Sequence, residues 1–278
     1  MIELKDLSYS YGRNSLPALE AVTASIGPGI YLLAGENGAG KTTLLHLIAG
    51  IKRPSIGQCL IDGVESSTNV PSKMGRTFLL EENMYFPGKS IRSFAAFHSH
   101  FYPEFSLEKF NDNLKAFGLS GDEPLKSLSL GNRKKSQLAY ALALGVDVLL
   151  LDEPTNGLDI QSKEALVKLL AANISELQTV IVATHTVGEL ETLFDGALML
   201  TRSRLLFAGT ADALSERISF EVTRMPDPSA LYSEIQVGRV LGIYPHLKDQ
   251  DATRVDWRLF YSALHSPQRD ILLTHLQS

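Results

Sequence analysis

The stretch GIYLLAGENGAGKTTLLHLIA, residues 29–49, decides the fold because three patterns follow one another within it. Its apolar beginning, Gly29 to Ala34, predicts a buried strand, and Thr43 to Ala49 has apolar residues at helical spacing. The run between them, Gly35 to Thr43, matches G-x-x-x-x-G-K-[ST]. A strand, a glycine-rich turn and a helix in this order predict a loop whose backbone N–H groups close around phosphate oxygens.

The residue types of this loop suit a phosphate ligand. The glycines let the backbone approach closely, Lys41 is expected to neutralise the β- and γ-phosphates, and the Thr42 hydroxyl is expected to hold Mg²⁺. A chance glycine-rich turn is the alternative, and the flanking strand and helix weigh against it. The candidate nucleotide-binding residues of the loop are Gly35, Asn37, Gly38, Gly40, Lys41, Thr42 and Thr43.

A second stretch, LLLDEPTNGLD at residues 149–159, places two acids directly after an apolar run. A bound magnesium nucleotide needs a carboxylate near the metal and a base near the attacking water. Asp152, at the end of the predicted strand, is expected to meet the metal through water. Glu153 points elsewhere and is expected to orient the water that attacks the γ-phosphate. An exposed strand-end turn is the alternative for this acid pair.

Strand and helix patterns alternate along the first two hundred residues. Val148 to Leu151 and Val180 to Ala183 predict buried strands, and Ser162 to Leu177 between them predicts a helix. This alternation indicates an α/β core with a mainly parallel sheet. Residues from about 82 to 130 are richer in aromatic and polar residues, and their pattern predicts a helical insertion.

The two ends of the chain differ from this core. LSYSYG and ALEAVTASI predict an N-terminal antiparallel β subdomain with a Gly/Arg/Asn turn. A boundary is expected near Leu214, with a core domain over residues 1–213 and an accessory α+β appendage over residues 214–278. The strand candidates of the appendage are SFEVTRM, GRVLGIY and TRVDWRLF. A last helix is expected around Asp270 to Leu276.

Composition excludes some classes of function. The chain has 278 residues, a net charge of −5 and a pI near 5.8, without the basic character of a nucleic-acid binder. Its single cysteine, Cys59, allows no internal disulfide and favours a reducing compartment. We expect no signal peptide at the N-terminus and no membrane-spanning run.

Together these motifs resemble the nucleotide-binding subunit of an ATP-binding cassette (ABC) transporter of the bacterial exporter type. The resemblance covers residues 1 to about 209 and implies a P-loop NTPase core. It includes a signature segment, LSLGNRKK at 128–135, a D-loop that ends at Asp159, and a switch histidine, His185, after the strand VIVA. The resemblance implies a γ-phosphate contact for His185, while a satisfied core histidine is the alternative.

An aromatic residue upstream of the phosphate loop stacks on adenine in this family. Tyr11 lies at that position, with Tyr9 as the nearby alternative. Stacking suits the role because a π-face holds adenine without hydrogen-bond readout. An ordinary surface residue is the other interpretation of Tyr11.

The sequence departs from the family pattern at two places. Where the family has a glutamine that contacts Mg²⁺, alignment on YFPGKSI places Glu81, which is expected to keep an oxygen on the metal. The alternative is a shifted loop with Glu81 in solvent. The usual Ser-Gly-Gly-Gln signature appears as Ser129, Leu130, Gly131 and Asn132. Ser129 and Gly131 are expected to supply a hydroxyl and an N–H group to a γ-phosphate.

The resemblance implies an ATPase that uses Mg²⁺ and closes as a head-to-tail dimer, most simply a homodimer. A separate membrane permease is expected as partner, with this subunit on the cytoplasmic face of the membrane, export favoured, and no nucleic acid bound. The runner-up is a soluble ABC ATPase that acts on ribosomes or nucleic acid. The cargo is not encoded in these motifs, and import and a heterodimer stay open.

Overall fold

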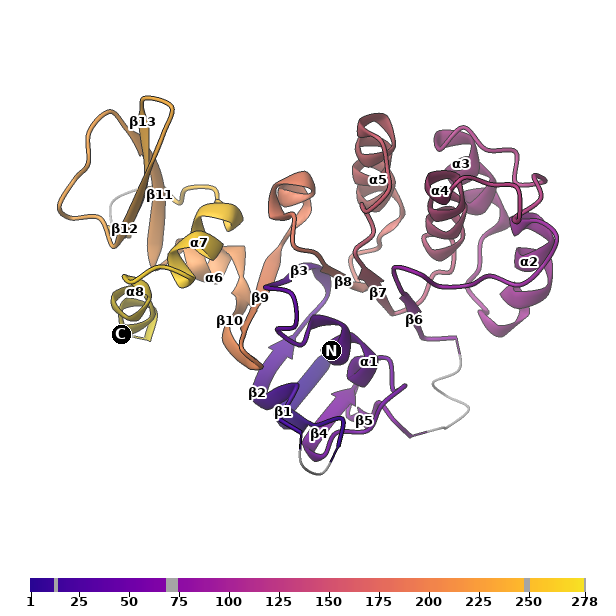
Figure 1. The fold of residues 1–278 in the computed structure, drawn as a ribbon, viewed down its shortest axis with the longest axis horizontal. Helices are drawn as coiled ribbons and strands as arrows, with labels where there is room; N and C mark the ends of the chain where they lie inside the picture. The colour runs from indigo at the N-terminus through magenta and orange to yellow at the C-terminus, as the bar shows by residue number, and fades with distance from the viewer. Residues whose placement is uncertain (13–14, 69–74, 248–250, 278) are drawn as a thin grey trace.

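The computed structural model describes residues 1–12, 15–68, 75–247 and 251–277. Figure 1 shows its three sheets and the helices that cover them. The central sheet has six strands in the order β10-β9-β3-β8-β7-β6, all parallel except β10. These strands are β3 (Gly29–Gly35), β6 (Thr77–Leu80), β7 (Val148–Asp152), β8 (Thr179–Ala183), β9 (Gly196–Thr201) and β10 (Arg204–Thr210).

The central strands are apolar on both faces because both faces are covered. Along β3, Leu32 and Ala34 face one core, and Tyr31 and Leu33 face a second core on the other side. The parallel register brings the carboxyl ends of β3, β7 and β8 to one edge. That edge is where an open α/β sheet binds its ligands.

The N-terminal sheet is antiparallel, as the sequence predicts, with strand order β2-β1-β4-β5. The predicted turn contains Arg13 and Asn14, which lie outside the described residues. Helix α1 (Lys41–Ile48) buries Leu44 and Leu47 in the second core between the two sheets. The strands are β1 (Ile2–Tyr9), β2 (Leu19–Ile26), β4 (Ile56–Ile61) and β5 (Val64–Glu65).

The insertion is helical, as expected, and lies beyond β6 in Figure 1. Its aromatic side chains pack around Tyr140, which is fully buried. His98 belongs to this cluster, because its ring stacks on Phe94 and its Nδ1 lies 2.8 Å from the Tyr140 hydroxyl oxygen. The helices of the insertion are α2 (Ile91–His98), η2 (Ser99–Phe101) and α3 (Leu107–Ala116); α4 (Leu130–Ala141) begins where the insertion ends, and α5 (Ile160–Asn173) follows β7.

The C-terminal part holds a three-stranded antiparallel sheet, β11-β13-β12, and two helices. The prediction of a strand over TRVDWRLF is wrong, because Asp256 caps a helix there by accepting a hydrogen bond from the N–H of Leu259. Leu214 lies inside α6 (Ala211–Ser215). The other elements are β11 (Ile218–Thr223), β12 (Tyr232–Gln236), which the sequence reading missed, β13 (Arg239–Pro245), α7 (Trp257–Leu264) and α8 (Arg269–Gln277).

The fold is therefore α/β with a mainly parallel sheet, an antiparallel N-terminal sheet, a helical insertion and a small α+β appendage, as the sequence predicts. Within the part of the chain that the structure describes, every helix is too short or too polar to cross a lipid bilayer.

Candidate nucleotide-binding site

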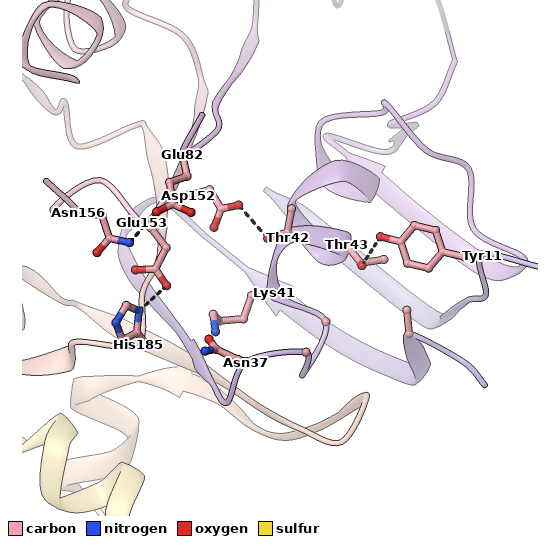
Figure 2. A pocket seen from close by; sticks show the side chains of 13 residues that line it. Tyr11, Asn37, Lys41, Thr42, Thr43, Glu82, Asp152, Glu153, Asn156 and His185 are labelled. Atoms are coloured by element: carbon pink, nitrogen blue, oxygen red, sulfur yellow. Dashed lines mark hydrogen bonds and ion pairs between the residues drawn. The ribbon is translucent and has the colours of Figure 1, made fainter. Parts of the chain in front are cut away.

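A cavity of about 510 Å³ opens at the carboxyl edge of the central sheet. Figure 2 shows side chains from the phosphate loop, the β7 end and the β8 end pointing into it. The parallel register therefore unites segments that are more than a hundred residues apart in sequence. The lining residues are Tyr11, Ala18, Asn37, Gly38, Gly40, Lys41, Thr42, Thr43, Glu82, Asp152, Glu153, Asn156 and His185.

The phosphate loop wraps the start of α1, as its motif predicts. Gly40 has a φ of 107° and precedes the helix, and a Cβ at this position would lie 2.5 Å from the carbonyl oxygen of Ala18. Only glycine fits both constraints. Lys41 is 8% exposed, and its Nζ donates to the carbonyl oxygens of Gly35 at 2.7 Å and Glu36 at 3.3 Å. Burial lowers the pKa of Lys41, against the opposing effect of two nearby carboxylates.

Thr42 and Asp152 lie next to each other in the cavity. The Thr42 hydroxyl donates to Oδ2 of Asp152 at 2.8 Å. Asp152 is 7% exposed, and burial raises the pKa of its carboxyl group, although the Thr42 bond acts in the opposite direction. A buried carboxylate beside a hydroxyl fits Mg²⁺, which prefers oxygen ligands and takes its remaining ligands from phosphates and water.

Glu153 turns away from Asp152 toward the end of β8. Its φ of 46° is uncommon for a residue with a side chain, and its N–H donates to the carbonyl oxygen of Ala183 at 2.8 Å. Oε1 lies 2.9 Å from Nδ1 of His185, while the buried Oε2 has no hydrogen-bond partner among the described residues. Since a buried oxygen without a partner is costly, Oε2 is an acceptor suited to a water in the cavity.

The structure does not place Glu81 in this cavity. Its Oε1 lies 2.5 Å from Nε2 of His46 in α1, and the cavity is lined instead by the next residue, Glu82. Oε1 of Glu82 accepts a hydrogen bond from Nδ2 of Asn156 at 2.8 Å. Glu82, and not Glu81, therefore presents a carboxylate oxygen to the cavity, because the side chains of these two adjacent residues have different partners.

Tyr11 lies at the mouth of the cavity. Its hydroxyl is 2.9 Å from Oγ1 of Thr43, and its ring is 63% exposed. The Tyr9 ring packs edge-on against it with centroids 5.1 Å apart, and the ammonium group of Lys52 is 5.0 Å from the Tyr11 centroid. Of the two tyrosines, Tyr11 is the one that offers an open ring face at the cavity.

Besides Glu81, four predicted residues do not line the cavity: Gly35, whose carbonyl oxygen accepts from Lys41, and Ser129, Gly131 and Asp159. Ser129 caps α4, with its hydroxyl oxygen accepting from the N–H of Asn132 at 3.2 Å; Ser129 is exposed and Gly131 is half-buried. Asp159 caps α5, and hydrogen bonds from the side chain and backbone of Ser162 lower its pKa to about 2. Ser129, Gly131 and Asp159 therefore lie outside the lining of the nucleotide cavity of their own chain.

Three residues that line the cavity, Ala18, Glu82 and Asn156, are not predicted from the sequence as site residues. Glu82 was passed over because the alignment favoured its neighbour, and Asn156 because it carries no charge. The signal for Asn156 was its position, three residues after Glu153 in the same loop.

A parallel sheet with a phosphate loop, an acid pair and a histidine at one edge defines a P-loop ATPase. Residues 19–156 match the family model described as ABC transporter. The energy-coupling factor transporter ATP-binding protein EcfA of Methanothermobacter thermautotrophicus is 32% identical over 222 residues, which cover 76% of this chain and 71% of that protein. The chain belongs to the ABC transporter ATP-binding family.

Two further comparisons agree. The ABC transporter ATP-binding protein NatA of Bacillus subtilis is 29% identical over 227 residues, which cover 78% of this chain and 92% of that protein. The solved structure of a dimeric bacterial ABC transporter cassette is also similar, with a TM-score of 0.64 and 22% identity. The matched region covers 76% of this chain and 98% of the cassette chain in that structure. The chain is thus an ABC ATPase and the ATP-binding subunit of a transporter.

Proposed function

We propose that this subunit drives transport through a separate membrane permease by hydrolysing ATP with Glu153 as the general base. One observation carries the proposal: Glu153 holds one oxygen on His185 and leaves the other without a partner in the cavity. A carboxylate in this position can take the proton of an attacking water. His185 orients Glu153 and reaches toward the γ-phosphate from the end of β8.

The other residues of the cavity hold the nucleotide. The phosphate loop encloses the phosphates with its N–H groups, and Lys41 exchanges its carbonyl partners for phosphate oxygens. Thr42 and Asp152 are the residues that would hold Mg²⁺, which supplies charge neutralisation between the β- and γ-phosphates. Tyr11 stacks on the base.

Ser129, Gly131 and Asp159 act on the nucleotide of a second subunit. Ser129 and Asp159 are exposed, and all three residues lie outside the lining of the cavity of their own chain, which fits a head-to-tail dimer in which each signature segment completes the other chain's site. Two copies of this chain are the simplest closed arrangement. ATP then favours the closed state because the added γ-phosphate contacts exist only there.

The helical insertion offers a surface for the permease. A cavity of about 140 Å³ lies between the segment after β6 and residues 125–126, and it is lined by Met84, Tyr85 and Phe86 among others. Phe97 is 74% exposed on α2 nearby. Phe94 is buried within the insertion, whereas Phe97 and Tyr85 are exposed and are available to contact a partner. Binding there places the subunit on the cytoplasmic face of the membrane.

Export is the direction that we propose, on the narrower ground of the altered signature segment Ser129–Asn132. The transporter names of the relatives do not assign a direction to this chain. Transport of a candidate cargo into or out of vesicles that contain the permease and this subunit measures the direction.

The first experiment is native purification of the tagged chain from detergent-solubilised membranes, followed by mass spectrometry. The expected result is a membrane protein with several spans in stoichiometric amount, lost when Phe97 and Tyr85 are changed to serine. Ribosomal proteins or nucleic acid in place of a permease would overturn the transporter proposal and favour an ATPase that acts on ribosomes or nucleic acid. ATP hydrolysis by the purified complex, compared with Glu153→Gln, tests the chemistry separately.

A further inference from the structure

The C-terminal part of the chain packs against the segment that follows His185. Two short helical turns, η3 (Val187–Glu189) and η4 (Glu191–Leu193), come directly after this histidine, and α7 contacts η3. In Figure 2 a yellow helix of this C-terminal part appears below His185 in the view. The C-terminal part, which has no recognisable chemical motif, thereby contacts the segment that follows His185.

Trp257, the first residue of α7, makes the most buried of these contacts. It is 1% exposed, and its Nε1–H donates to the carbonyl oxygen of Phe194 at 3.4 Å. Its ring packs near Phe207 and Phe260, with centroids 6.4 and 6.2 Å away. A buried indole N–H needs an acceptor. Trp257 therefore fixes the far end of the segment that begins at His185.

A second contact comes from the segment itself. Oε1 of Glu191 accepts a hydrogen bond from the N–H of Arg258 at 3.4 Å, in the first turn of α7, where N–H groups have no partner within the helix. Burial, and then the nearby Asp256 carboxylate, raise the pKa of Glu191. The Glu191 side chain is therefore held, partly buried, at the N-terminus of α7.

The same helix is tied to the C-terminal sheet. Nη2 of Arg258 is 3.0 Å from Oε1 of Glu234 on β12. Helix α7 therefore contacts both the C-terminal sheet, at β13, and the segment after His185, at η3.

We propose that α7 positions His185 through residues 187–194, with Trp257 as the principal positioning residue, so that a displacement of the C-terminal sheet changes the rate of ATP hydrolysis. The proposal rests on the proposed function, in which His185 acts at the γ-phosphate. Neither Trp257 nor Glu191 lines the nucleotide cavity, so their effect passes through the segment and not through contact with ATP.

Trp257 is the single tryptophan of the chain, so its fluorescence reports on this contact. The full chain with Glu153→Gln is saturated with Mg²⁺ and ATP, and binding is measured in parallel with a fluorescent nucleotide. The expected result is a change in tryptophan emission on binding, absent when His185→Ala is added although ATP still binds. Unchanged emission with ATP bound, or a change that persists without His185, would overturn the inference. Failure to bind ATP at all would instead contradict the proposed function.

A kinetic comparison tests positioning against simple stability. Trp257→Phe keeps a buried ring but removes the bond to Phe194, and we expect kcat to fall about two- to tenfold with KM nearly unchanged. The matched control is Tyr244→Phe, which removes a polar group from another buried aromatic ring, on β13, whose hydroxyl has no hydrogen-bond partner among the described residues. A fall in Trp257→Phe alone supports the inference. Unchanged kcat in Trp257→Phe, or an equal fall in both variants, would overturn it.

Discussion

Two pairs of adjacent acids follow neighbouring parallel strands of the central sheet, and the structure uses them differently. Asp152 and Glu153 end β7, and Glu81 and Glu82 follow β6, its partner strand. In each pair the two side chains point to different partners, and one of them meets a histidine. The side chain of Glu153 is only 12% exposed, whereas the side chain of Glu81 is 44% exposed.

This difference in burial decides what each pair can do. The pair after β7 lies between the phosphate loop and β8, so each oxygen must have a partner or a ligand. The pair after β6 borders solvent, where water can satisfy a carboxylate in several orientations. We therefore expect large functional effects from the buried pair and smaller ones from the exposed pair.

The largest effect is expected from Glu153→Gln. Removing a general base lowers the rate by about 10²- to 10⁴-fold, while ATP binding is kept because the phosphate loop is unchanged. Phosphate release measures turnover, and light scattering after size exclusion measures the dimer, which is expected to persist with ATP in this variant. Turnover close to that of the unchanged protein would remove Glu153 from the role of base.

The next effect is expected from Asp152→Asn, which changes the carboxylate bonded to Thr42. Loss of a group that holds or orients a metal ligand costs about 10- to 100-fold in metal affinity. We expect the Mg²⁺ concentration for half-maximal turnover to rise by that order. Titration of Mg²⁺ at saturating ATP measures it, and removal of Mg²⁺ with EDTA should abolish turnover in both proteins. An unshifted titration would contradict the metal role of Asp152.

A smaller effect separates the two acids after β6. Glu82→Gln is expected to raise the Mg²⁺ requirement several-fold, because Glu82 lines the cavity, and Glu81→Gln is expected to leave turnover of the same order. The two variants make the same chemical change one residue apart, so each is the control for the other. A higher Mg²⁺ requirement in Glu81→Gln alone would instead indicate that Glu81 contacts the metal, as the alignment on YFPGKSI predicts.

These pairs also show how far the sequence could predict the site. The phosphate loop, Asp152, Glu153 and His185 were placed at one edge in advance, because strand ends of a parallel sheet meet there whatever the side chains do. The choice between Glu81 and Glu82 depends on backbone torsions of a loop, which carry no periodic signal. The strand predicted over TRVDWRLF is wrong for a related reason. Its alternation of apolar and polar residues is typical of a strand, but Asp256 caps a helix that begins at Trp257.

The smallest effect is expected from the contact between Glu81 and His46. The pair joins the end of β6 to α1, but the partly exposed carboxylate is screened by water. Pairs of this kind contribute about 0–1 kcal/mol. A double-mutant cycle with Glu81→Gln and His46→Gln, followed by urea unfolding, measures the coupling as a difference in the free energy of unfolding. Coupling well above this range would mean that the contact fastens α1, and with it the phosphate loop, to the start of the helical insertion. Glu81 would then affect the nucleotide site by holding α1 in position, whereas Asp152 and Glu153 act on the metal and the attacking water directly.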